Sequence, residues 1–420
     1  MNRAEIHFNI FYALLIIGIA TLPFSIFLQL PVILLLFVNF ITEWNWKEKI
    51  ANVKKNGLTG FFFLFIGLYL LYFLGTFYSQ NLHYALSDLE CKLFFLITPL
   101  VLFTTDSTRF HQKKISTLFN IFILSCTLLA LTNLAIAGFH YASNHEMKEF
   151  FYNRLSHFMH PSYGAMYVTT AFLLSLDKLF IHKETDKRLR RLCGLSLCIL
   201  LPYLFMLQSK AGMLMFVFSV VLYVLYILNF QKRSLVKSAL FLCLCGLSLI
   251  GLYRFTPIFG RMDEAVTALK TTEDSNKKEV AKKEGTVKRT LIWECAWEAG
   301  TEHLPFGTGT GDVKQAILQK YQDKNYTFLV EKQYNAHCQY LQTFVALGLL
   351  GIFYLLAFLG VPALIALRRK DYLYVLFLFV VGGNLLVECM FEVRAGCDFI
   401  ALFNVLFCCL SQQKKPKSGN

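Results

Sequence analysis

A histidine and two cations of this chain have the types and surroundings that a group-transfer reaction needs. His337 lies in Asn335-Ala-His-Cys-Gln, directly before a long apolar run, and Arg289 begins a helical pattern in which Trp293 follows one turn later. Lys210 lies in a very short turn between two other apolar runs. A neutral imidazole can remove a proton from a hydroxyl, and guanidinium and ammonium groups stabilise the charge of a departing diphosphate. Each residue alone has a simpler interpretation, as an interfacial histidine or an interface anchor, but together they favour transfer of a sugar from a lipid diphosphate.

The segment from Pro305 to Asp312 reads Pro-Phe-Gly-Thr-Gly-Thr-Gly-Asp and has glycines at alternate positions. Such a backbone can present amide donors to an anion, so Gly309 and Gly311 are candidate diphosphate-binding residues. A sharp turn that returns a loop to the membrane explains the same pattern. The segment lacks the lysine of a P-loop, which argues against a nucleotide site.

Further polar residues are expected at the same face of the predicted membrane bundle as His337, Arg289 and Lys210. Glu388 lies one turn from Glu392, and ionisable residues at the edge of a membrane favour a functional role. The alternative is that both carboxylates pair internally with Arg394, Lys210 or Arg289. The candidates for a supporting role in the site are Trp293, Gln339, Tyr340, Glu388, Arg394 and Arg154.

The elements that must hold these residues are predicted to be transmembrane helices. Hydrophobic residues make up 56% of the 420-residue chain, charged residues make up 16%, and the mean hydropathy is +0.50. Apolar runs long enough to cross about 30 Å of hydrocarbon recur along the chain. Because unbroken runs exclude the alternating pattern of a membrane barrel, the predicted fold class is an all-α polytopic bundle. Twelve spans are predicted, near 8–24, 26–42, 58–79, 92–106, 116–139, 161–181, 192–208, 211–230, 236–253, 341–367, 372–393 and 398–412.

Lysines and arginines gather in every second connection of the predicted bundle. By the positive-inside rule, these connections and both termini face the cytoplasm, and the long polar stretch faces outside. The predicted organisation is nine spans in 1–253, a large outer loop in 254–340, three spans in 341–412 and a cytoplasmic tail in 413–420. The net charge of +14 is spread over the cytoplasmic connections, which favours anionic membrane lipid as a partner and argues against nucleic acid.

Several other classes of protein are disfavoured. The first apolar run lacks a small-residue cleavage site, so it is predicted to be an uncleaved span. The 12 cysteines lie mostly within spans and show no CxxC spacing, so neither a disulfide framework nor a metal or redox site is expected. No Asp-x-Asp cluster suggests a divalent metal, which favours metal-independent chemistry without a cofactor. Within the loop, 262–288 has the composition of a solvated linker.

The order of these motifs resembles the O-antigen ligase family, whose membrane domain is shared with O-antigen polymerases and some protein O-oligosaccharyltransferases. The resemblance rests on the turn around Lys210, on Arg289 before the tryptophan-containing helix, on the segment from Pro305 to Asp312, and on His337 with the apolar run that follows. Family members similarly have many spans and one large periplasmic loop, so the resemblance covers most of the chain. It implies a fold like that of the type C glycosyltransferases.

The resemblance also implies an activity. It implies an inverting ligase of the bacterial inner membrane that joins a glycan from undecaprenyl diphosphate to lipid A–core oligosaccharide at the periplasmic face, with Arg289 as the essential loop arginine and His337 as the base. Two positions depart from the family pattern, because Lys210 replaces an arginine and Cys338 replaces an asparagine. Lysine lacks the planar fork of arginine, so diphosphate binding is expected to depend more on Arg289 or on Arg261.

Two alternatives remain open. A polymerase or a protein-glycosylating relative would use the same donor and differ in the acceptor that enters. A lipid-linked glycan flippase or another transporter would place its charged residues at mid-membrane. The relative positions of Lys210, Arg289 and His337 discriminate between these classes, because a transferase needs them close together at one face.

Overall fold

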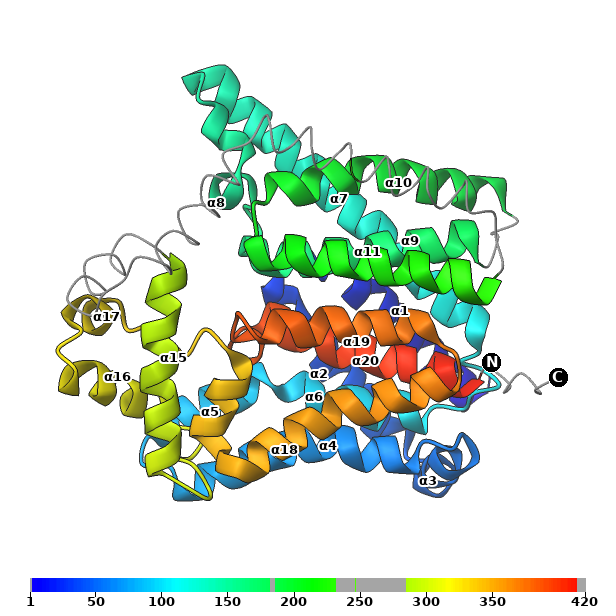
Figure 1. Ribbon diagram of the computed structural model, residues 1–420. Helices are drawn as coiled ribbons and strands as arrows, with labels where there is room; N and C mark the ends of the chain where they lie inside the picture. Colours follow the sequence, from blue (N-terminus) through cyan, green and yellow to red (C-terminus); the bar gives the residue numbers. More distant parts are fainter. Residues whose placement is uncertain (1, 182–185, 232–245, 247–284, 414–420) are drawn as a thin grey trace.

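The structure is a computed structural model that describes residues 2–181, 186–231, 246 and 285–413 (Figure 1). Within these ranges every regular element is a helix, and no strand occurs. The predicted all-α polytopic fold class is therefore confirmed.

Every predicted span within the described ranges coincides with a helix, and the span expected near 236–253 lies almost entirely outside them. Seven of the described helices are long and apolar enough to cross a bilayer, or up to eight if a pair bent by 109° counts as one span. The total of twelve spans therefore stays a prediction. The helices at predicted spans are α1 (Arg3–Thr21), α2 (Ile26–Glu43), α4 (Thr59–Gly75), α6 (Leu93–Thr104), α7 (Gln112–Asn144), α9 (Pro161–Phe180), α10 (Lys187–Met206), α11 (Lys210–Gln231), α18 (Gln339–Arg368), α19 (Tyr372–Leu385) and α20 (Arg394–Gln413).

Shorter helices connect these spans. The bent pair consists of α2 and α3, and α3 carries four lysines, which suits a helix at the edge of a membrane. The part of the predicted outer loop that the structure describes folds into three helices. The shorter elements are α3 (Trp46–Lys55), η1 (Thr76–Tyr78), α5 (Leu82–Cys91), η2 (Met147–Phe150), α8 (Tyr152–Leu155), α15 (Gly285–Glu302), α16 (Val313–Asp323), α17 (Thr327–Lys332) and η3 (Met390–Glu392).

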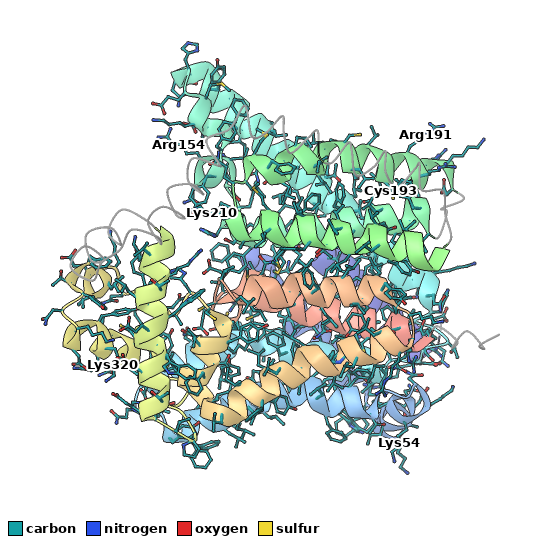
Figure 2. All side chains as sticks on the ribbon, in the orientation of Figure 1. Lys54, Arg154, Arg191, Cys193, Lys210 and Lys320 are labelled. Carbon is teal, nitrogen blue, oxygen red and sulfur yellow. The ribbon has the colours of Figure 1, made fainter. Side chains whose placement is uncertain are left out.

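The bundle has two distinct ends (Figure 1). The helices α15, α16 and α17 gather at one end, which we call the loop end, and α15 stands across the direction of the long helices. Helix α1 begins and helix α20 ends at the opposite end, which we call the terminal end. Figure 2 places Lys54 and Arg191 at the terminal end, and Arg154, Lys210 and Lys320 at the loop end. The arrangement agrees with connections that alternate between two faces of a membrane.

Phenylalanine packing fills the centre of the bundle around α20. The ring of Phe403 lies 4.4 Å from that of Phe122 on α7, and Phe407 lies 4.8 Å from Phe377 on α19. Helices in lipid gain no hydrophobic driving force from one another, so close van der Waals contact of this kind must hold them together. The frequent phenylalanines of the sequence thus have a packing role in the described bundle.

Helix α18 is broken at Gly348, where φ is 62° and ψ is −148°. The unbroken helix suggested by the apolar run 341–367 is therefore corrected. The Leu349 N–H donates to the Pro305 carbonyl at 3.1 Å, and a β-carbon at position 348 would lie 2.0 Å from that oxygen. Only glycine fits both the backbone conformation and the close approach. The break fixes the loop segment that begins at Pro305 against the bundle.

Candidate active site

A single carboxylate lies at the centre of the candidate site. Glu388 follows the end of α19, and its Oε1 lies 3.3 Å from His337 Nδ1, within hydrogen-bonding distance. Its other oxygen, Oε2, lies 4.0 Å from Nη2 of Arg289. We call these three residues the Glu388 cluster. The cluster unites the predicted base and the predicted loop arginine, and it confirms the pairing with Arg289 that the sequence left as an alternative for Glu388.

The surroundings of Glu388 keep it charged. Only 11% of its side chain is exposed, and this burial by itself would raise the pKa of the carboxyl. The hydrogen bond with His337 and the charge of Arg289 act in the opposite direction and prevail, so the pKa of Glu388 is lowered from its ordinary value of 4.5. The cluster therefore holds a carboxylate anion between an imidazole and a guanidinium.

His337 is held in a strained turn directly before α18. Its φ is 44°, a left-handed conformation that is uncommon for a residue with a side chain. The Asn335 side chain accepts the His337 N–H at 3.1 Å and so supports the turn. A quarter of the His337 side chain remains exposed. The imidazole is thus fixed by its backbone and still accessible to a substrate.

Helix α15 brings Arg289 to the cluster. The helix packs closely on the first turns of α18. A β-carbon added at Gly300 would lie only 2.4 Å from the Phe344 ring, so glycine is needed at this contact. Trp297 stacks on the same ring at 5.2 Å. About a third of the Arg289 side chain is exposed. The indole Nε1 of Trp293, one turn further on, is buried and has no hydrogen-bond partner among the described residues.

Two glutamines on the first turn of α18 hold the two backbone segments that carry Glu388 and His337. Gln339 accepts the N–H of Phe391 at 2.8 Å, and Gln342 accepts the N–H of Ala336 at 3.2 Å. The first contact holds the turn that follows Glu388, and the second holds the residue before His337. Gln339 was a predicted supporting residue. Gln342 was not, although its spacing of three from Gln339 on a helix was a usable signal.

Two further polar residues lie near the starts of other helices, Lys210 at α11 and His160 at α9. Lys210 begins α11 at the loop end (Figure 2), and the first turn of α11 packs on α9, since a β-carbon at Gly212 would lie 2.4 Å from that of Ala165. His160 immediately precedes α9. Burial lowers the pKa of His160, Glu388 opposes this shift, and Arg289 and His337 add to it. The charges of the cluster therefore act on His160, which the sequence places in the outer loop before Pro161 but which was not proposed as a site residue.

The glycine segment has a structural role in the described part of the chain. The Gly309 N–H donates to the Ala346 carbonyl at 3.0 Å, and the Gly311 N–H donates to Ser79 Oγ at 2.9 Å. The carboxylate of Asp312 accepts the N–H groups of Gln80 and Asn81 at 2.7 and 2.9 Å. Because the amides of Gly309 and Gly311 are already paired, the geometry favours the turn interpretation over diphosphate binding.

Several predicted supporting residues lie elsewhere. Arg154 pairs with Glu146 and Glu149 at 2.5 and 2.6 Å, and Arg394 pairs with Glu90. Their guanidinium groups form ion pairs with these carboxylates and not with Glu388. The Tyr340 hydroxyl donates to the Gly382 carbonyl at 3.1 Å and joins α18 to α19. The predicted diphosphate ligand Arg261 lies outside the described residues.

No group of three or more His, Cys, Asp or Glu side chains in the described ranges is arranged to hold a metal ion. Two cavities in the same part of the chain are lined by residues of the terminal end, one by His7 and Arg109, the other by Lys55 and Gln413. Neither cavity touches the Glu388 cluster.

Comparison with known families identifies the segment that carries the site. Residues 195–356 match the family model described as O-antigen ligase. The matched residues include Lys210, Arg289 and His337, whereas Glu388 lies beyond them. No curated protein matches the chain. This segment of the helical membrane protein is therefore similar to the O-antigen ligase family, whose members are glycosyltransferases of the ligase and polymerase types.

Proposed function

We propose that this protein transfers a glycan from undecaprenyl diphosphate to a hydroxyl of lipid A–core oligosaccharide, at the periplasmic face of the bacterial inner membrane. The observation that carries the proposal is the Glu388 carboxylate, which lies 3.3 Å from His337 and 4.0 Å from Arg289. A proton acceptor and a cation for the leaving group thereby share one small region at the loop end. A transporter would not need this pairing at one end of the bundle.

His337 is assigned the role of general base. In the tautomer that carries hydrogen on Nδ1, His337 donates to Glu388, and the lone pair of Nε2 remains available. Nε2 takes the proton of the acceptor hydroxyl as its oxygen attacks the anomeric carbon. The bond from that carbon to the diphosphate oxygen breaks, and its electron pair leaves with the diphosphate. A single displacement of this kind inverts the anomeric configuration. Glu388 orients the imidazole and stabilises the imidazolium that forms.

Arg289 is assigned the role of binding the diphosphate of the donor. A guanidinium has five N–H donors, so an ion pair at 4.0 Å with Glu388 leaves donors for phosphate oxygens. Lys210 adds a compact charge from the first turn of α11, without the bidentate geometry of arginine. Arg261 remains a further candidate for the same group. In this assignment the negative charge that develops on the leaving group is stabilised by protein cations.

An in vitro assay with purified protein, lipid diphosphate glycan and lipid A–core acceptor tests the proposal. We expect His337→Ala to lower the transfer rate by at least about 100-fold, because a positioned general base contributes about 100- to 10,000-fold. Lys320→Gln is the matched control, since Lys320 is a cation of the loop end that pairs with Glu302. Its rate is expected to equal that of the wild type, with or without chelator.

Three outcomes of the assay would change the assignment. Equal transfer by wild type and His337→Ala would refute the role of the base. Joining of one donor glycan to another, without use of the lipid A–core, would indicate a polymerase. Loss of transfer on chelation would refute metal-independent chemistry.

A further inference from the structure

A second group of charges lies buried around Lys92 and includes Glu392, four residues after Glu388. Lys92 lies between α5 and α6, and only 1% of its side chain is exposed. Its ammonium contacts Asp88 on α5 and lies 3.3 Å from Oε1 of Glu392 in η3. It also lies 4.6 Å from the centre of the Tyr72 ring. Lys92 thus joins α4, α5 and η3 at one buried point.

Burying these charges is costly, which calls for an explanation. An ammonium removed from water loses its hydration, and partner charges repay the loss only when their geometry is good. Here one cation faces two carboxylates and a ring face, which is a specific arrangement. Packing alone would be served as well by an apolar side chain of similar size. The arrangement therefore points to control of position.

Through its contact with Glu392, Lys92 holds the turn that carries Glu388. Glu392 lies four residues after Glu388, and Phe391 between them donates its N–H to Gln339 at 2.8 Å. Gln339 also donates to Thr343 Oγ1 at 3.2 Å, and that hydroxyl lies 2.8 Å from the hydroxyl of Tyr72. The turn is thus held at Glu392 by Lys92, at Phe391 by Gln339, and at Glu388 by the cluster.

We propose that Lys92 is a positioning residue for glycan transfer, which holds Glu392 and the turn 388–392 so that the Glu388 carboxylate lies between His337 and Arg289. The inference rests on the proposed function of that cluster. Lys92 touches neither the imidazole nor the diphosphate in this arrangement. It acts through the turn, over a separation of 300 residues between Lys92 and Glu392.

The test compares Lys92→Met, Glu392→Gln and the double variant in the transfer assay. We expect each single variant to lower kcat by about 10- to 100-fold, since a small displacement of a catalytic group has effects of that size. The double variant should lose no more than the worse single variant, because both substitutions remove the same contact. Lys320→Gln again serves as the control.

Two readouts separate positioning from loss of folded protein. Displacing the Glu388 carboxylate removes a charge that favours the imidazolium of the proposed base over its neutral form, so we expect the acid limb of the kcat profile to move to lower pH in Lys92→Met and Glu392→Gln. Hydrogen exchange of a peptide covering 388–397 should become faster, because the Phe391 N–H loses its fixed acceptor. A smaller amount of correctly folded enzyme would lower kcat without moving the acid limb.

The outcomes are distinct for the inference and for the proposed function. If wild-type protein transfers no glycan, the proposed function fails, and hydrogen exchange alone decides whether Lys92 holds the turn. If wild type is active, and folded Lys92→Met has the wild-type kcat and the wild-type acid limb, the positioning role is overturned. If Lys92→Met does not fold, Glu392→Gln decides by the same criteria, since it leaves the pair of Lys92 and Asp88 intact.

Discussion

At the scale of single residues, Glu388 is the group whose placement calls most for a functional explanation. Its partner Arg289 is about one-third exposed, and exposed ion pairs contribute only about 0–1 kcal/mol to stability. Such a gain does not account for a largely buried carboxylate that also contacts His337. Orientation of the imidazole accounts for it better, because the hydrogen bond selects one tautomer and one ring position.

The lowered pKa of Glu388 predicts a pH-dependent contribution to stability. A carboxyl whose pKa is lower in the folded state stabilises the fold above its ordinary value of 4.5, and this contribution is lost as the pH falls through the lowered value. We therefore expect wild-type protein to have a higher Tm than Glu388→Gln at pH 6. The difference should shrink below about pH 4.5.

Thermal unfolding of both proteins in detergent at a series of pH values measures this difference. Glu302→Gln is the control, since Glu302 is an exposed partner of Lys320. A difference in Tm between wild type and Glu388→Gln that stays constant down to pH 3 would contradict the charged, stabilised state of Glu388.

The sequence brings Arg289, Glu388 and His337 to one level of the membrane, but it does not show which of several cations Glu388 contacts. Arg394, which lies nearer to Glu388 in the chain, pairs with Glu90 instead. Ion pairing between distant segments depends on how α15 and α19 pack, and single-sequence patterns carry no record of that packing. Lys92 was missed for the same reason, since its partner Glu392 is 300 residues away.

At the scale of elements, the lengths of the apolar runs predicted the helices well, while their interruptions depended on tertiary contact. The run 341–367 contains no proline before position 362, yet α18 breaks at Gly348. The cause is the loop segment at Pro305, which lies against the break. A glycine in an apolar run often means only close helix packing, so the sequence could not distinguish the two cases.

The break in α18 predicts a specific cost for adding one methyl group. Gly348→Ala would place a β-carbon 2.0 Å from the Pro305 oxygen at a positive φ, so we expect a loss of about 1–3 kcal/mol of stability, measured as a lower Tm. Gly360→Ala is a matched control on the same helix, because nothing lies within 4 Å of its added β-carbon. We expect that control to keep or raise the Tm. Equal values for the two variants would refute the packing argument.

At the scale of the whole molecule, helix α15, which carries Arg289, lies at one end of the bundle, and α1 begins and α20 ends at the opposite end (Figure 1). The positive-inside rule predicts that the terminal end faces the cytoplasm, and a lipid A–core acceptor would be met at the other face. The proposed reaction therefore depends on orientation in the membrane as much as on the cluster. The orientation can be measured without any assay of transfer.

Labelling of introduced cysteines from each side of the membrane tests this orientation. Lys320 lies at the loop end and Lys54 at the terminal end (Figure 2), and Cys198 is replaced by alanine because it is exposed. We expect a membrane-impermeant maleimide to label Lys320→Cys in right-side-out vesicles and Lys54→Cys only in inverted vesicles. The parent without either introduced cysteine is the control for background labelling. Labelling of both positions from one face would contradict the two-ended arrangement, and the reverse pattern would place the Glu388 cluster in the cytoplasm, where the proposed acceptor could not reach it.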